Sequence, residues 1–170
     1  TVFISLKELE HGRVEFSTTF NPGALDFYGA DVEQRAPLAF VGWAELVRGE
    51  ICIQGHLEGL VCHPCDRCLE LMQISIEKDL DLFYRPRQVV ASEEEVEISP
   101  GESEISFFSG DGINLKDLAS EQVILSIPMK AVCRPECRGL CPACGTNRNV
   151  MNCRCKGPDR GSPFAGLKNY

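Results

Sequence analysis

Six of the ten cysteines lie within 23 residues, from Cys133 to Cys155. The chain from Cys133 onward has too few apolar side chains to form a hydrophobic core of its own, so we expect cysteine to hold it together. Residues 141–145 read Cys-Pro-Ala-Cys-Gly, the spacing of a zinc knuckle, in which two thiolates converge on one ion and glycine permits the tight turn. With the nearest remaining pair, the predicted metal ligands are Cys141, Cys144, Cys153 and Cys155.

A second Cys-x-x-Cys pair lies upstream, and with the two remaining cysteines of the tail it would make a second four-sulfur set: Cys65, Cys68, Cys133 and Cys137. The sequence therefore predicts one or two structural zinc ions, and one site with spare thiols fits the spacing nearly as well. Cys52 and Cys62 are left over in either case. The alternating pattern around Cys52 predicts a half-buried strand residue.

Clustered cysteines suit three kinds of chemistry, and the sequence favours structural zinc over the other two. Disulfides need an oxidising compartment, and no signal peptide is visible. A redox-active Cys-x-x-Cys usually opens a helix that lowers the thiol pKa, whereas Cys65–Cys68 precedes a strand pattern and Cys141–Cys144 lies in a turn. A catalytic zinc needs an open position beside a general base, and the tail has no histidine. His63, beside Cys62 and Cys65, is an alternative ligand in place of one sulfur.

Charge is divided unevenly along the chain. The net charge is −8, but residues 130–170 carry +6 and the remaining residues −14. A basic, ordered module can contact the phosphate groups of RNA. Only Phe164 and Tyr170 in this segment could stack on bases, so we expect recognition of RNA shape or backbone. The alternative is that these charges only solvate an exposed module. The candidate RNA-binding residues are Arg134, Arg138, Arg148, Arg154, Lys156, Arg160 and Lys168.

The first half of the chain is predicted to form antiparallel strands. Apolar and polar residues alternate, as in half-buried strands, over three segments: 14–20, 51–61 and 72–84. Only Lys78 interrupts the apolar face of the last segment. Arg48-Gly49 is predicted to turn the run around Leu38–Val47 into the next strand. This arrangement leaves Cys62–Cys68 at the tip between two long strands.

One helix is predicted after the strands. Residues 92–112 carry seven carboxylates and no basic residue, which is typical of a solvated loop, here with a short strand at Ile105–Phe108. Asn114 is a good helix N-cap, and Pro128 ends the helical pattern that follows. The predicted fold is α+β, mainly antiparallel β in a barrel-like or sandwich sheet, with one helix and a C-terminal cysteine-rich zinc module. Its parts are an antiparallel β body (1–91), an acidic flexible loop (92–113), a helix packed on the sheet (114–129) and a basic cysteine-rich module (130–170).

Three stretches of the chain carry motifs of one known family. They are Cys65–Glu70 at the predicted tip, a block from Leu125–Pro128 through Cys133, Cys137–Gly145, Asn147, Asn149, Cys153 and Cys155, and the closing Pro163–Lys168. These motifs resemble the YceD-like family of bacteria and plastids, named for large ribosomal RNA subunit accumulation. Here Arg148 stands where the family pattern usually has an apolar residue, which adds a positive charge.

This resemblance implies a non-enzymatic role in the synthesis, processing or stability of 23S ribosomal RNA, with structural zinc and no catalytic residues. The implied partners are 23S rRNA or a large-subunit assembly intermediate, contacted directly or through ribosomal proteins. We expect no association with a membrane, since no stretch approaches the ~18 apolar residues of a spanning helix. We also expect no small-molecule substrate. The expected location is the bacterial cytoplasm, or the plastid stroma if a transit peptide has been removed. Two other functions stay open: a zinc-dependent protein-interaction adaptor without RNA contact, and a thiol oxidoreductase.

Overall fold

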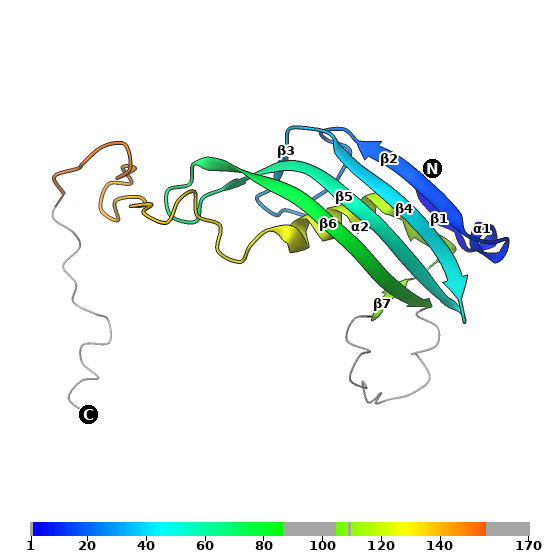
Figure 1. Ribbon diagram of the computed structural model, residues 1–170. Helices are drawn as coiled ribbons and strands as arrows, with labels where there is room; N and C mark the ends of the chain where they lie inside the picture. The colour runs from blue at the N-terminus through cyan, green and yellow to red at the C-terminus, as the bar shows by residue number, and fades with distance from the viewer. Residues whose placement is uncertain (1, 87–104, 109, 156–170) are drawn as a thin grey trace, which may run out of the picture. The chain divides into compact units, whose positions relative to one another are not determined.

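Two separate stretches of sequence build each of the two units of this chain. The computed structural model describes residues 2–86, 105–108 and 110–155 (Figure 1). The first unit, the body, comprises residues 1–62 and 73–128, and the second, the cysteine unit, comprises residues 63–72 and 129–170. The tip between the two long strands therefore belongs with the C-terminal cysteines.

The main element of the body is a curved six-stranded sheet. Its strands are β2 (Val14–Phe20), β3 (Glu33–Gln34), β4 (Leu38–Val47), β5 (Glu50–Pro64), β6 (Leu71–Pro86) and β7 (Ile105–Phe108). The path runs β2-β4-β5-β6-β7, with β3 paired to β5 off this path. Between β4 and β5, Arg48 and Gly49 have φ values of 52° and 85°, as a type I′ hairpin turn requires. The predicted turn at this position is therefore confirmed.

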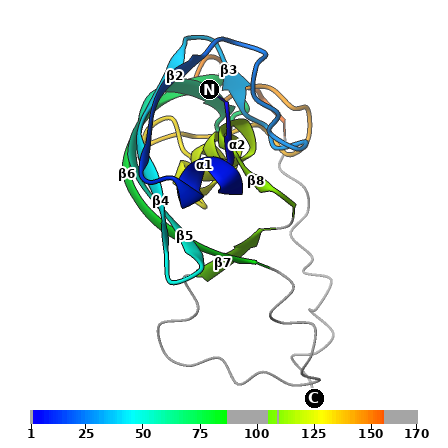
Figure 2. The same cartoon turned by 90° about the vertical axis from the view of Figure 1, so that its right-hand side faces the viewer.

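Helix α2 (Leu115–Ser126) lies against the concave face of this sheet (Figures 1 and 2). The Asn114 side chain caps the helix, as predicted, by accepting a hydrogen bond from the Lys116 backbone N–H at 3.0 Å. Lys78, the one polar residue on the apolar face of β6, donates from Nζ to Gln122 Oε1 on the helix at 3.0 Å. The largest side chains of this core are fully buried and come mainly from the sheet: Phe20, Leu38, Phe40, Ile51, Ile53, Leu57 and Ile76.

The predicted fold class needs two corrections. The described residues contain two helices rather than one, because α1 (Leu6–Glu10) follows β1 (Phe3–Ser5). Five residues are too few to show a helical period, and the signal for α1 is instead a capping box between Ser5 and Glu8. The sheet is also open, with edges at β2 and β7, so it is not a barrel. A helix rather than a second large sheet covers its concave face (Figure 2).

The segment between β6 and α2 is described only in part. The predicted strand at Ile105–Phe108 is confirmed as β7, although it pairs parallel with β6 in an otherwise antiparallel sheet. Strand β8 (Gly112–Asn114) pairs antiparallel with β1. Residues 87–104, which hold most of the predicted acidic loop, lie outside the described residues. No helix in the described part of the chain is long and apolar enough to cross a membrane.

Candidate metal centres

Four cysteines that are far apart in the sequence come together in the cysteine unit. Cys65 and Cys68 lie in the turn between β5 and β6, and Cys133 and Cys137 follow α2. The Sγ atoms of Cys65 and Cys137 are 3.9 Å apart, and those of Cys68 and Cys133 are 3.8 Å apart. All four sulfurs lie within 4.8 Å of one another, and all of these residues except Cys133 are buried. We call these four residues the hairpin cluster.

The other four cysteines of the C-terminal segment also converge. The sulfurs of Cys141, Cys144, Cys153 and Cys155 lie within 4.8 Å of one another, and we call these residues the tail cluster. Only Cys141 is buried, whereas Cys144 and Cys155 are exposed. The structure thus brings together both four-cysteine sets that the sequence suggested. Cys52, half-buried, and Cys62, buried, belong to neither cluster.

The Cys-x-x-Cys pairs of the two clusters adopt the same backbone turn. In the hairpin cluster, the Leu69 N–H donates to the Cys65 carbonyl at 2.9 Å, and in the tail cluster the Gly145 N–H donates to the Cys141 carbonyl at 2.8 Å. Leu69 and Gly145 therefore occupy equivalent positions, with φ values of 61° and 73°. Glycine reaches this left-handed region freely, whereas leucine does not. The knuckle at Cys65 is consequently harder to recognise from its sequence than the one at Cys141.

Asn149 links the two clusters. It belongs to the loop between the two cysteine pairs of the tail cluster, yet its Nδ2 donates to Cys137 Sγ of the hairpin cluster at 3.3 Å. Its Oδ1 accepts a hydrogen bond from the Arg138 backbone N–H at 2.8 Å. Groups that hydrogen-bond to metal ligands orient those ligands and tune their basicity. In the sequence, Asn149 stood out only as part of the family motif, and its supporting role was not predicted.

Two further polar residues of the hairpin tip hold the cysteine unit together. The Asp66 N–H donates to the Ala131 carbonyl at 2.8 Å, and the Ala131 N–H donates back to Asp66 Oδ2 at 2.6 Å. Asn147 Nδ2 donates to Glu70 Oε1 at 2.8 Å. The tip is thus tied to the segment after α2 and to the loop of the tail cluster by hydrogen bonds as well as by its cysteines.

Hydrogen bonding divides the thiols of each cluster into two groups. Burial opposes ionisation of Cys65, but backbone N–H groups, including that of Cys133, point at its sulfur and lower its pKa to about 6. Partial desolvation of the Cys133 sulfur, together with hydrogen bonds from its neighbours Cys137, Cys65 and Cys68, raises the pKa of Cys133 to about 12 although the residue as a whole is exposed. Hydrogen bonds from Thr146 lower the pKa of Cys144 to about 6, while hydrogen bonding with Cys144 raises the pKa of Cys155 to about 12. Four neighbouring thiolates repel one another, so a divalent cation is needed for all of them to ionise.

The donor set and its spacing suit zinc. Four sulfurs bound tetrahedrally at ~2.3 Å from one ion lie about 3.8 Å apart, which agrees with the 3.8 and 3.9 Å separations in the hairpin cluster. A disulfide needs sulfurs at ~2.05 Å, and the ten cysteines of this structure are free thiols. His63 is not required as a ligand: its Nδ1 lies 2.7 Å from the Pro64 carbonyl oxygen, and each cluster has four sulfurs without it. Two closed four-cysteine sets match structural rather than catalytic zinc.

The structure describes four of the seven candidate RNA-binding residues, and all four are exposed: Arg134, Arg138, Arg148 and Arg154. Arg138 Nη1 donates to Asn152 Oδ1 at 3.2 Å. None of the four makes a salt bridge to another described residue. Lys156, Arg160 and Lys168 lie outside the described residues.

Residues 53–169 match the family described as large ribosomal RNA subunit accumulation protein YceD. The chain belongs to the YceD family. The matched region contains β6, α2 and all eight cysteines of the two clusters. Both candidate metal centres therefore lie within the part of the chain that defines its family membership.

Two curated relatives that match this YceD-family chain are named as uncharacterized proteins. The chain is 29% identical over 129 residues to uncharacterized protein Rv2926c of Mycobacterium tuberculosis strain H37Rv and to uncharacterized protein Mb2951c of Mycobacterium bovis. The aligned region covers 75% of this chain and 59% of each relative, so the chain spans about three fifths of their length. No solved structure matches the chain.

Proposed function

We propose that this YceD-family protein supports the accumulation of 23S ribosomal RNA as a non-enzymatic factor, and that zinc bound by both clusters gives the cysteine unit its fold. The family match over residues 53–169 carries this proposal, because the family description names accumulation of the large ribosomal RNA subunit. Its proposed place of action is the bacterial cytoplasm, or the plastid stroma for a plastid protein.

The small core of the cysteine unit supports a structural role for zinc. Among the described residues, only Met72 and Val132 join the buried cysteines of the hairpin cluster in the hydrophobic cluster of this unit. So few apolar contacts cannot offset the conformational entropy lost when the 37 described residues of this unit (63–72 and 129–155) become ordered. Structural zinc contributes on the order of 10 kcal/mol or more to the folding of small modules. On this proposal, the metal provides most of the free energy that orders this unit.

The placement of the arginines connects zinc binding with RNA binding. Arg134 follows Cys133, Arg138 follows Cys137, and Arg154 lies between two cysteines of the tail cluster. An ion that fixes the sulfurs therefore also fixes the backbone that carries these exposed cations. A rigid array of arginines suits contacts to RNA phosphates, which are bound through counterion release and weaken as salt rises.

The proposal is tested by depleting the protein and measuring the ratio of 23S to 16S rRNA. Rescue is compared for the wild type, for Cys141→Ser and for Cys52→Ser, a matched control because Cys52 is a cysteine outside both clusters. We expect depletion to lower the ratio, and we expect wild type and Cys52→Ser, but not Cys141→Ser, to restore it. An unchanged ratio after depletion would contradict the proposed role.

A protein-interaction adaptor without RNA contact is the second candidate. Large apolar side chains are exposed in the cysteine unit, with Val150 at 76% and Met151 at 63% of their surface accessible, and such residues are common in protein interfaces. Charge reversal at Arg134 and Arg154 should abolish salt-sensitive RNA binding if RNA is contacted directly, whereas Val150→Ser with Met151→Ser should leave it intact. The adaptor is favoured if the wild type binds no RNA and if, in the rescue assay, the charge-reversed variant restores the rRNA ratio whereas Val150→Ser with Met151→Ser does not.

A thiol oxidoreductase is not favoured by any contact in the described part of the chain. Neither Cys-x-x-Cys pair there lies at the start of a helix, where a redox thiol would be activated. Failure of the zinc-loaded protein to turn over a disulfide substrate is the expected result.

A further inference from the structure

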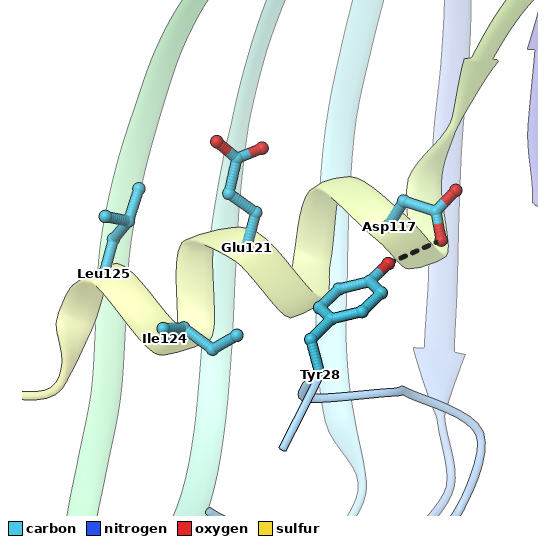
Figure 3. A pocket seen from close by; sticks show the side chains of 5 residues that line it. All are labelled: Tyr28, Asp117, Glu121, Ile124 and Leu125. Carbon is cyan, nitrogen blue, oxygen red and sulfur yellow. Dashed lines mark hydrogen bonds between the residues drawn. The ribbon is translucent and has the colours of Figure 1, made fainter. Parts of the chain in front are cut away.

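The body has a surface hollow of about 310 Å³ beside α2, lined by Tyr28, Asp117, Glu121, Ile124 and Leu125 (Figure 3). We propose that this hollow docks a protein segment that carries an apolar side chain flanked by lysine or arginine. The proposal concerns the body alone and does not depend on zinc or RNA binding by the cysteine unit.

The outward face of α2 supplies the floor of the hollow. Asp117, Glu121, Ile124 and Leu125 follow the i, i+4, i+7, i+8 spacing of one helix face, opposite the face buried against the sheet. Leu125 is 63% exposed and adjoins the partly buried Ile124, so an apolar surface is accessible in the hollow. The lining residues of the helix are thus carboxylates nearer its N-terminal end, at Asp117 and Glu121, and apolar side chains nearer its C-terminal end.

A strained loop holds the wall of the hollow. Tyr28 lies in the connection between β2 and β3 with φ of 51°, a conformation that is rare for a bulky residue and marks sites where surroundings impose it. Its N–H donates to Asp26 Oδ1 at 2.8 Å, and its hydroxyl donates to Asp117 Oδ1 at 3.2 Å. Tyr28 is nevertheless 64% exposed as a residue. The loop therefore positions an aromatic side chain beside α2 without burying it.

Charge identifies the kind of partner. Neither Asp117 nor Glu121 forms a salt bridge with a basic side chain among the described residues, and Asp26 adds a third carboxylate beside Tyr28. Basic side chains of a partner would find these carboxylates at the rim, while an apolar side chain would cover Ile124 and Leu125. Electrostatic complementarity of this kind sets the specificity and rate of association.

The size and openness of the hollow favour a peptide over a small molecule. A volume of about 310 Å³ is at the lower limit for ligand pockets, which bury ~70–90% of the ligand surface. The exposure of Tyr28 and Leu125 rules out such enclosure. An aromatic wall next to an apolar floor on one helix is instead suited to a single anchoring side chain, as at the centre of protein interfaces.

The test uses the full chain and a short fluorescein-labelled peptide with a central phenylalanine flanked on each side by paired lysines. Fluorescence anisotropy measures its affinity for the wild type and for a double variant, Asp117→Asn with Glu121→Gln. A control double variant, Glu58→Gln with Glu77→Gln, removes the same charge from exposed positions on the sheet. Leu125→Ser removes apolar floor at an already exposed site, and thermal unfolding confirms that each variant is folded.

We expect the Asp117/Glu121 variant to bind about threefold to tenfold more weakly, since each exposed ion pair contributes modestly, and the control to bind like the wild type. Leu125→Ser, and a peptide with alanine in place of phenylalanine, should also bind more weakly. Equal weakening by both double variants would show nonspecific attraction to an acidic body and overturn the proposal. Absence of peptide binding by the wild type, or concentration-dependent dimerisation that Leu125→Ser abolishes, would overturn it as well.

Discussion

Replacing Asn149 by alanine tests whether the two clusters bind metal and whether one supports the other. The substitution removes the hydrogen bond from Nδ2 to Cys137 Sγ at 3.3 Å and the acceptor for the Arg138 N–H at 2.8 Å. Removing a hydrogen-bond partner of a metal ligand lowers metal affinity about 10- to 100-fold, or about 1.4–2.8 kcal/mol. Because sulfur is a weak hydrogen-bond acceptor, we expect the lower end of this range, about tenfold weaker zinc binding at the hairpin cluster, and little change at the tail cluster.

The measurement is stepwise zinc release from the loaded protein to a chromophoric chelator. A Cys65→Ser variant, which removes one ligand of the hairpin cluster and leaves the tail cluster intact, identifies which of the two release steps belongs to the hairpin cluster. Asn152→Ala is the matched control, because Asn152 is an asparagine of the same segment whose side chain contacts Arg138 Nη1 and no sulfur. If Asn149→Ala released zinc no more readily than Asn152→Ala, the proposed support of Cys137 would be wrong. If the wild type bound no zinc, the assignment of both clusters would fail.

Three further predictions concern stability. Gly145→Ala should destabilise the zinc-loaded cysteine unit by about 1 kcal/mol, because φ is 73° and the cost comes from the backbone alone, with no atom crowding the new Cβ. Leu69→Gly, at φ 61°, should not destabilise it. Chelator titration compares the two variants, and a Gly145→Ala protein that keeps zinc better than Leu69→Gly would show that the two turns are not equivalent. Lys78→Met should destabilise the body by about 1–3 kcal/mol, because it leaves the buried Gln122 side chain without its hydrogen-bond donor. Adding Gln122→Leu should restore the free energy of unfolding measured in urea, and a double variant as unstable as the single one would refute this pairing. Removing zinc with a chelator, or with acid, in which protons compete for the thiolates, should expose the backbone amides of residues 133–155 to hydrogen exchange while those of α2 stay protected. Loss of protection in both regions at the same time would contradict separate sources of stability for the two units.

Local patterns were sufficient to predict the longer strands of the body, but not the short strands β1, β3 and β8. The alternation over 14–20 and the turn at Arg48-Gly49 depend on neighbouring residues only, and the structure has β2 and the β4–β5 hairpin at those positions. Helix α1 was missed because one turn of helix carries no period, although its capping box was readable in Ser5 and Glu8. The parallel pairing of β7 depends on where the chain returns after a long connection, which local patterns do not encode.

The candidate site was predictable to different extents in its two halves. The tail cluster joins residues at most 14 positions apart, and its Cys-Pro-Ala-Cys-Gly knuckle is a local signal. The hairpin cluster joins Cys65 to Cys137 across 72 positions, so counting cysteines suggested it without showing that the chain could bring them together. Asn149 and Tyr28 were not predicted as functional, because their roles depend on contacts with distant residues and on a backbone conformation that neither residue type signals.

This difference in sequence separation implies an order of assembly for the cysteine unit. The entropy lost on closing a loop grows with the logarithm of its length, at about 0.6 kcal/mol per doubling. Closing the 72-position loop between Cys65 and Cys137 therefore costs about 1.5 kcal/mol more than closing the short loop of the tail cluster, unless other contacts have already closed it. Folding of the body does so, since Cys65 and Cys68 lie in the turn of the β5–β6 hairpin and Cys133 and Cys137 follow α2, which packs on the same sheet. The tail cluster can thus form locally, and the Asn149 it positions is then in place when Cys137 completes the hairpin cluster.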